Sequence, residues 1–164
     1  MLMIGNETQH FKNRSIFKYP FLLLRWLLSS FSSRRVIVTS CDRATTVSAY
    51  FQSDLFFFTS QIECSPIVIF EAAAAGLPFL STDVGNVKEI ASWTNSGELM
   101  ATFKDENGFS YPDFKVAAIQ LEQLLNDGTR MKKYSESGRK SWMEKFTWEA
   151  ITNQYLDIYN KLIS

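Results

Sequence analysis

Short apolar runs alternate with helical patterns of hydrophobic residues along the first two thirds of the chain. The apolar runs predict strands at Leu2–Ile4, Val36–Val38, Leu55–Phe58, Pro78–Ser81 and Glu98–Thr102. Helical patterns lie between them at Tyr19–Phe31, Thr45–Gln52, Pro66–Ala75 and Val87–Ala91. Strands and helices that alternate in this way are typical of a parallel sheet. We therefore predict an α/β fold, in which a parallel sheet carries helices on both faces.

The last third of the chain has a helical pattern only, from Tyr111 onward. An apolar stripe over Phe114–Leu125 predicts a helix that stops at Gly128, and a second helix is expected over Thr129–Phe146. Thr147 is expected to cap a final helix. The apolar stripe of that helix consists of Trp148, Ile151, Tyr155, Ile158, Tyr159 and Leu162. C-terminal helices thus close the expected fold.

Composition excludes several classes of function. The 164 residues carry 17 basic and 17 acidic side chains, and this zero net charge argues against a nucleic-acid partner. Cys41 and Cys64 form no Cys-x-x-Cys pair and His10 is the only histidine, so no metal site or Cys-His catalytic pair is expected. The length favours a single domain over residues 1–164, and the two cysteines suit reduced thiols of a cytoplasmic protein.

No membrane-spanning segment is predicted. The most apolar stretch, Phe21–Leu28, is shorter than the ~18–20 residues that a spanning helix needs, and Arg25 interrupts it. We interpret this stretch as a core helix. The alternative is a helix on a membrane surface, which would place the protein at the cytoplasmic face of a membrane as a peripheral contact.

The segment Pro66–Ala75 predicts a helix with well-specified ends. Ser65 is a favoured N-cap, Pro66 suits the first helical position, and Gly76 suits the left-handed position after the last turn. Every residue from Pro66 to Ala75 is apolar except Glu71, so the helix is expected to be buried on all sides. A buried carboxylate needs a cation, hydrogen-bond donors or a ligand. The alternative places Glu71 at a surface gap of the helix.

Two loops are expected at the ligand-binding edge of the sheet. Thr59–Glu63 follows one predicted strand and Thr82–Asn86 follows the next, and ligands bind beyond the carboxyl ends of parallel strands. The N-terminus of the Pro66 helix opens at the same edge, where its N–H groups favour an anion such as phosphate. Together with Glu63 and Glu71, this edge suits a sugar phosphate.

The segment from Glu63 to Glu71, ECSPIVIFE, resembles the Glu-x7-Glu signature of group 1 retaining glycosyltransferases, which have two Rossmann domains in the GT-B arrangement. The blocks that follow, Ala72–Pro78 and Thr82–Ile90, are similar to the next conserved blocks of that family. A fainter resemblance extends from Met1 to the C-terminus and includes Val36–Asp54 and the segment from Phe146 to Tyr159. The resemblance implies a Rossmann-like domain that binds a nucleotide sugar.

The resemblance also implies roles for single residues. Glu63 would contact hydroxyls of the donor sugar and is the catalytic candidate, and Glu71 would bind the ribose. The segment between them would border the sugar and the diphosphate, through Cys64, Ser65, Pro66, Ile67 and Val68. Cys41 and Arg43, in the loop that begins at Thr39, would border the nucleobase. No metal and no cofactor is implied, because the nucleoside-diphosphate sugar is itself a co-substrate.

The function implied is that of a donor-binding domain, which transfers a sugar with retention to a glycan or a lipid-linked acceptor. The alternatives are a nucleotide-sugar-binding module without turnover and a nucleotide-sugar epimerase. An N-terminal Rossmann domain is the expected partner. The resemblance also implies a first β-α unit whose loop carries Arg and Lys for the diphosphate, a basic clamp, and this unit is expected to be missing. Lys12, Arg14 or Arg43 is the alternative source of that clamp. We accordingly expect weak donor binding and no transfer from residues 1–164 alone.

Overall fold

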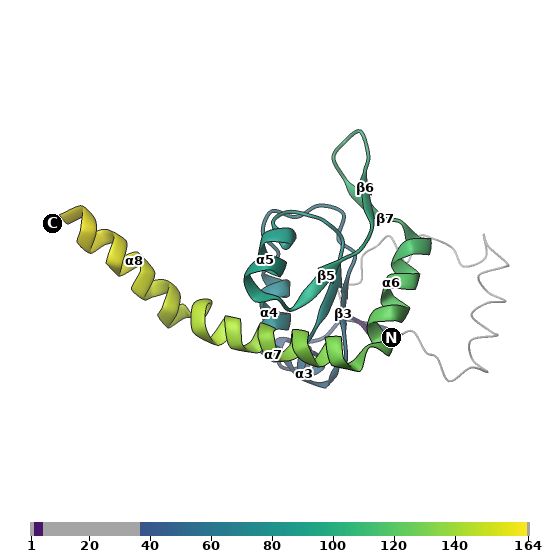
Figure 1. Cartoon of the computed structure of the whole chain (residues 1–164), viewed down its shortest axis with the longest axis horizontal. Coiled ribbons are helices and arrows are strands. Elements are labelled where there is room, and N and C mark those ends of the chain that lie inside the picture. The colour runs from purple at the N-terminus through teal and green to yellow at the C-terminus, as the bar shows by residue number, and fades with distance from the viewer. Residues whose placement is uncertain (1, 5–36, 164) are drawn as a thin grey trace. The chain divides into compact units, whose positions relative to one another are not determined.

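The computed structural model describes residues 2–4 and 37–163 (Figure 1). The predicted helix Tyr19–Phe31 and the side chains of His10, Lys12 and Arg14 lie outside the described residues. The chain divides into two compact units, residues 1–49 and 50–164. The assignment of one domain to residues 1–164 stays a prediction.

Two parallel strands form the sheet of the first unit, β1 (Leu2–Ile4) and β2 (Ile37–Thr39). Both strands were expected from the sequence, and β2 extends one residue past its predicted end, to Thr39. Helix α3 (Arg43–Gln52) begins in this unit, two residues before its predicted start. The reason is that the carboxylate of Asp42 accepts the N–H of Thr45 at 2.8 Å. Hydrogen bonds from the side chain of Thr45 and from its N–H together lower the pKa of Asp42.

The second unit contains a three-stranded parallel sheet in the order β3-β4-β5. Its strands are β3 (Phe56–Phe58), β4 (Phe79–Ser81) and β5 (Gly97–Leu99). Helix α4 (Ile67–Ala75) connects β3 to β4, and α5 (Val87–Thr94) connects β4 to β5. The predicted β-α-β order is therefore confirmed.

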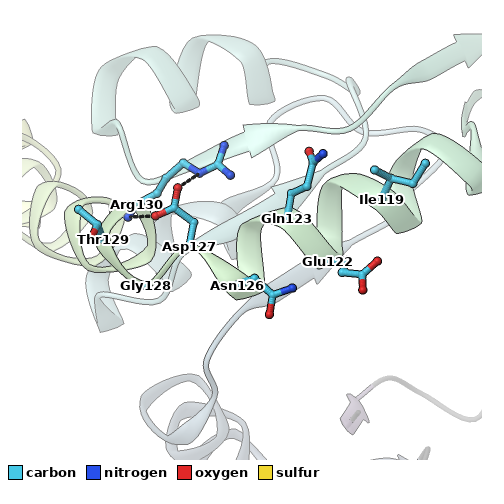
Figure 2. A pocket seen from close by; sticks show the side chains of 8 residues that line it. All are labelled: Ile119, Glu122, Gln123, Asn126, Asp127, Gly128, Thr129 and Arg130. Carbon is cyan, nitrogen blue, oxygen red and sulfur yellow. Dashed lines mark hydrogen bonds and ion pairs between the residues drawn. The ribbon is translucent and has the colours of Figure 1, made fainter.

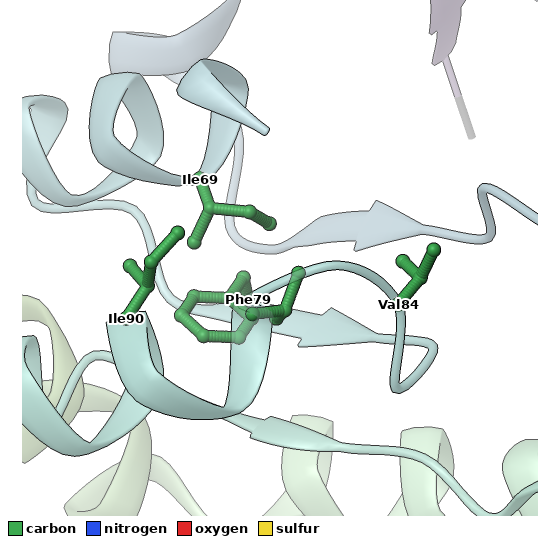
Figure 3. Packing of buried hydrophobic residues seen from close by; sticks show 5 residues of the cluster. Ile69, Phe79, Val84 and Ile90 are labelled. Carbon is green, nitrogen blue, oxygen red and sulfur yellow. The ribbon is translucent and has the colours of Figure 1, made fainter. Parts of the chain in front are cut away.

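The central strand β4 places its side chains alternately on the two faces of the sheet. Phe79 packs with Ile69 of α4 and Ile90 of α5, and Figure 3 shows these side chains pointing toward one another. The next residue, Leu80, belongs to the opposite cluster, which includes Leu124 of helix α6 (Phe114–Asn126). Helices cover both faces of the sheet, as predicted.

Helix α7 (Gly128–Lys145) packs against α4, α5 and α6. The predicted stop at Gly128 is wrong, because α6 ends at Asn126 and Gly128 is the first residue of α7. Asp127 causes the break, since its carboxylate accepts the N–H of Arg130 at 2.9 Å and so caps the second helix.

Helix α8 (Trp148–Ile163) follows α7 and is capped as predicted, because the hydroxyl of Thr147 accepts the N–H of Ala150 at 3.2 Å. No residue of α8 is buried, and the exposed fraction of its large apolar residues reaches 88% at Trp148. The expected apolar stripe is present but does not close the core. In the described part of the chain, no helix is both long enough and apolar enough to cross a membrane.

An antiparallel hairpin replaces part of the purely helical pattern predicted after Tyr111. The predicted strand Glu98–Thr102 is divided between β5 and β6 (Thr102–Lys104), and β6 pairs with β7 (Ser110–Pro112). Figure 1 shows this hairpin extending past β5. Its turn is held by Asp105, which accepts the N–H groups of Asn107 and Phe109, both at 2.9 Å. Strands of three residues are too short to show an alternating pattern.

Helix α4 differs from its prediction at its start and in its burial. It begins at Ile67 with Pro66 as N-cap, and no side chain caps it, so the expected cap at Ser65 is wrong. Gly76 adopts the predicted left-handed conformation with φ of 68°. Burial on all sides is also wrong, because Ile67 is 70% exposed and Glu71 is only partly buried. Within α4, Ile69, Ala72 and Ala73 are buried, Ile67 is exposed, and the other residues are partly buried.

Candidate functional site

The loops that follow β3 and β4 lie together at the carboxyl edge of the sheet. The register pairs Phe58 with Ser81, so the two strands end at the same level. Thr82 then binds the first loop twice: its N–H donates to the carbonyl of Phe58 at 3.0 Å, and its hydroxyl donates to that of Ser60 at 2.6 Å. The structure thus brings together the two loops that the sequence places at one edge.

Gly85 allows the closest approach between these loops. Its φ is 54°, in the left-handed region that favours glycine. A Cβ at this position would collide with the carbonyl of Cys64 and would lie 3.0 Å from the carbonyl oxygen of Glu63. The N–H of the next residue, Asn86, donates to the carbonyl of Cys64 at 3.1 Å. The segment before α4 therefore rests directly on the backbone of the second loop.

The hairpin supports both loops from a third side. The N–H of Ser110 donates to the carbonyl of Gln61 at 2.7 Å, and the hydroxyl of Ser110 donates to the carbonyl of Asp83 at 2.9 Å. The hydroxyl of Thr102 accepts the N–H of Asp83 at 3.1 Å. Sequence reasoning missed this support, although the turn from Asp105 to Gly108 between two aromatic residues was a usable signal for a hairpin.

These contacts are made with carbonyl groups at the end of β3 and in the loop after it, and not with the N–H groups of that loop. Four carbonyls accept hydrogen bonds from neighbouring elements, those of Phe58, Ser60, Gln61 and Cys64. Within residues 2–4 and 37–163, no acceptor receives the N–H of Gln61, Ile62, Glu63, Cys64, Ser65, Ile67 or Val68. We call these seven groups the free-amide segment. It leads directly into the N-terminus of α4, where the helix dipole adds positive potential.

The side chains predicted to touch the ligand surround the free-amide segment. Glu63, Cys64 and Ser65 are exposed, Pro66 is buried, and Val68 is partly buried. Glu71 lies four residues after Ile67, about 6 Å further along the axis of α4 and on the same face. The carboxylate predicted to bind the ribose therefore lies one turn from the amides predicted to bind the diphosphate.

Cys41 and Arg43 belong to the first unit of the chain. Cys41 is partly buried in the loop before α3, and Arg43 is the first residue of that helix and is exposed. Their contact with the nucleobase stays a prediction.

A shallow hollow lies elsewhere, at the turn between α6 and α7 (Figure 2). It contains none of the predicted site residues. Its cation, Arg130, is already paired with Glu98 at 3.0 Å and with Asp127 at 3.3 Å. The hydroxyl of Tyr134 also donates to Glu98 at 2.9 Å, and burial together with this carboxylate raises the pKa of Tyr134 to about 12. These groups join α7 to β5 and have a structural role.

Comparison with known proteins matches the chain to glycosyl transferases. A family model described as "Glycosyl transferases group 1" matches residues 33–141. The chain is 35% identical over 107 residues to N-acetyl-alpha-D-glucosaminyl L-malate synthase of Bacillus anthracis. It is 33% identical over 107 residues to a probable sucrose-phosphate synthase of Thermosipho melanesiensis. Each match covers 65% of this chain, but only 26% and 22% of the respective relative.

Solved structures show the same fold at lower sequence identity. Sucrose-phosphate synthase from Thermosynechococcus elongatus matches with a TM-score of 0.68 and 19% identity, over 99% of this chain and 38% of that one. HepE of Anabaena in complex with UDP matches with a TM-score of 0.69 and 15% identity, over 98% of this chain and 40% of that one. Both are similar to this chain over less than half of their own length.

The chain belongs to the group 1 glycosyl transferases, because the family model matches most of it. The fold is that of the GT-B enzymes among its structural neighbours. The resemblance noted from the sequence is thus confirmed at the level of the family. The assignment of Glu63 and Glu71 to the family signature stays a prediction.

Proposed function

We propose that this chain is the donor-binding part of a retaining glycosyltransferase. It would bind a nucleoside-diphosphate sugar and take part in transfer of the sugar to a glycan or a lipid-linked acceptor. The observation that carries this proposal is the free-amide segment at the N-terminus of α4. Unpaired backbone N–H groups beside a helix N-terminus form an anion site, and a diphosphate is the anion that this family handles.

The neighbouring carboxylates support a sugar nucleotide over a simple phosphate. Glu71, one turn along α4, would accept hydrogen bonds from the ribose, and Glu63 would accept them from the donor sugar. Ile67 and Val68 would donate their N–H groups to the diphosphate, with Cys64, Ser65 and Pro66 beside the sugar. HepE of Anabaena has been solved with UDP and with UDP-glucose, which makes UDP the first nucleotide to test.

The chemistry required of these residues is positioning and charge stabilisation. During transfer the bond between the anomeric carbon and the diphosphate oxygen would break, the oxygen of the acceptor hydroxyl would bond to that carbon on the same face, and the hydroxyl proton would pass to the departing diphosphate. Negative charge grows on the departing diphosphate, where fixed N–H groups stabilise it most. Glu63 would hold the sugar so that its anomeric carbon faces the acceptor.

A second Rossmann domain is part of this proposal. The chain spans 38–40% of the solved glycosyltransferases that share its fold. In the two-domain arrangement, the acceptor would bind mainly to the other domain and would reach the donor across the space between them. The acceptor site would therefore lie mainly outside residues 1–164.

Nucleotide binding tests the proposal, with calorimetry of UDP and UDP-glucose in the full-length protein. Glu71→Ala should weaken UDP binding by about tenfold, because the ribose loses an acceptor worth ~1–3 kcal/mol. Glu63→Ala should leave the affinity for UDP unchanged and should weaken the binding of UDP-glucose. The matched control is Glu122→Ala, which removes a carboxylate from α6 and should change neither affinity.

Equal UDP affinities for the unchanged protein and Glu71→Ala would contradict the ribose assignment. Binding of the nucleotide sugar without any transfer by the full-length protein would favour a binding module instead. Interconversion of the bound sugar would favour an epimerase.

A further inference from the structure

The hydroxyl of Ser60 is the anchor of the Glu63 side chain. It lies 2.9 Å from Oε1 of Glu63 and 3.3 Å from the carbonyl oxygen of Ile62. A serine hydroxyl has one proton and donates to one acceptor at a time. The carboxylate is both nearer and charged, and charge-assisted hydrogen bonds are the stronger ones. Ser60 therefore donates to Glu63.

Ser60 is itself fixed from the sheet. The hydroxyl of Thr82 donates to the carbonyl of Ser60 at 2.6 Å, and Thr82 is fully buried. Thr82 directly follows β4, and its N–H donates to the carbonyl of Phe58, the last residue of β3. A chain of hydrogen bonds thus runs from the paired strands through Thr82 and Ser60 to the carboxylate of Glu63.

This chain explains how an exposed carboxylate on an irregular loop can have a defined position. Glu63 is exposed and lies in neither a helix nor a strand, so its side chain has little packing to restrict it. A glutamate that is free to rotate loses conformational entropy when it binds a ligand. The bond to Ser60 restricts the side chain before the ligand arrives, which is preorganisation.

The same geometry leaves one oxygen of the Glu63 carboxylate available to a ligand. Oε1 of Glu63 receives the proton of Ser60, whereas Oε2 has no hydrogen-bond donor among the residues that the structure describes. We infer that Ser60 is a positioning residue for the donor sugar, which orients Glu63 so that Oε2 accepts a sugar hydroxyl, and that Thr82 holds Ser60 in place. This inference rests on the proposed function, because it takes Glu63 as the sugar contact.

A double-mutant cycle tests the inference in the full-length protein. The measured quantity is the sugar increment, the ratio of the Kd of a nucleoside diphosphate to the Kd of its sugar nucleotide. The probes are UDP with UDP-glucose and UDP-N-acetylglucosamine, and GDP with GDP-mannose. Ser60→Ala should reduce the largest of these increments by about three- to tenfold and should leave the affinity for the nucleoside diphosphate unchanged.

The decisive comparison is Ser60→Ala in a Glu63→Ala background. If Ser60 acts through Glu63, its removal has no further effect on the sugar increment once the carboxylate is gone. Ser60→Thr keeps a hydroxyl and should therefore retain the sugar increment of the unchanged protein. Ser92→Ala is the matched control, since it removes an exposed hydroxyl from α5 that donates only to the carbonyl of Glu89.

The role of Thr82 is tested with a matched pair of variants. Thr82→Val removes the hydroxyl at nearly constant shape and should reduce the sugar increment as Ser60→Ala does, whereas Thr82→Ser should retain it. An additive effect of Ser60→Ala in the Glu63→Ala background would overturn the inference, as would an unchanged increment in Ser60→Ala. Absence of UDP and GDP binding by the unchanged protein would instead overturn the proposed function and, with it, this role. If nucleotides bind but the sugar adds no affinity, only the assignment of Glu63 as a sugar contact would be overturned, and with it this role of Ser60.

Discussion

The packing of α7 against α4 and against Ser96, the residue before β5, depends on the absence of a side chain at Gly138. A Cβ on Gly138 would lie 2.5 Å from the Cβ of Ser96 and 3.6 Å from the Cα of Ala73. Ser96 has little freedom to move away, because its hydroxyl is hydrogen-bonded to that of Thr94 at 2.6 Å. Its carbonyl also accepts the N–H of Phe79 at 3.1 Å. We predict that Gly138→Ala destabilises the protein.

Two opposing effects set the loss of stability expected for Gly138→Ala. In the interior of an exposed helix, replacing glycine by alanine gains about 1 kcal/mol. Forcing an extra carbon into a packed site costs about 1–3 kcal/mol, and the 2.5 Å approach to a fixed Cβ places this site at the upper end. The net loss should be about 1–2 kcal/mol, which lowers the Tm by about 2–8 °C for a domain of this size.

Urea unfolding followed by circular dichroism measures this loss. The matched control is Gly128→Ala, the same substitution in the same helix, where a Cβ would meet nothing within 4 Å. The control should be neutral or stabilising by up to about 1 kcal/mol. In addition, Ser96→Gly should recover part of the stability of Gly138→Ala, because it removes the carbon that the new side chain would meet. A Gly138→Ala protein as stable as the unchanged one would refute the packing argument.

Two further predictions concern the site and the alkaline pH range. Gly85→Ala should weaken UDP binding more than tenfold, because its Cβ would collide with the carbonyl of Cys64 and displace the free-amide segment; unchanged affinity by calorimetry would contradict this reasoning. Burial and the hydrogen bond to Glu98 raise the pKa of Tyr134 from its ordinary value of 10.0 to about 12. Because the unfolded chain loses this proton at a lower pH than the folded protein does, the free energy of unfolding should fall as the pH rises from 10 to 12. In Tyr134→Phe this part of the decline should be absent from unfolding free energies measured across that range, and an identical slope would show that the proton is not involved.

The fold could be predicted where local pattern and tertiary packing agree. The apolar run at Pro78–Ser81 predicts a strand of a sheet with helices on both faces, and the structure places Phe79 and Leu80 in opposite clusters. Gly76 ends α4 where the sequence places the end, because the left-handed conformation strongly favours glycine. Such signals are local and therefore visible in the sequence.

The hairpin and the exposure of α4 could not be predicted, for different reasons. Each strand of the hairpin has three residues, too few for a period of two to appear. Ile67 is apolar but 70% exposed, and its position at the sheet edge, beside the loops, is a tertiary property. Composition alone cannot distinguish an apolar residue in a core from one at a binding edge.

The candidate site, like the fold, could be predicted from the sequence only in part. The sequence predicts which side chains gather at the sheet edge, because that follows from strand order. It does not reveal that the N–H groups of residues 61–65 have no acceptor among the residues that the structure describes, since this depends on which distant residues bind the carbonyls. Thr82, Asn86 and Ser110 make those bonds, and they are separated from the loop by about 20 to 50 positions in the chain.

A loop held by its carbonyl groups can change its side chains without moving its backbone. Cys64 and Ser65 are exposed, and the contacts that fix this segment use its own carbonyl groups, so they would survive replacement of either side chain. Mutation at these two positions would therefore alter the surface beside the free amides and leave the amides in place. In evolutionary terms, the backbone contacts can be inherited unchanged while the side chains at these two positions diversify.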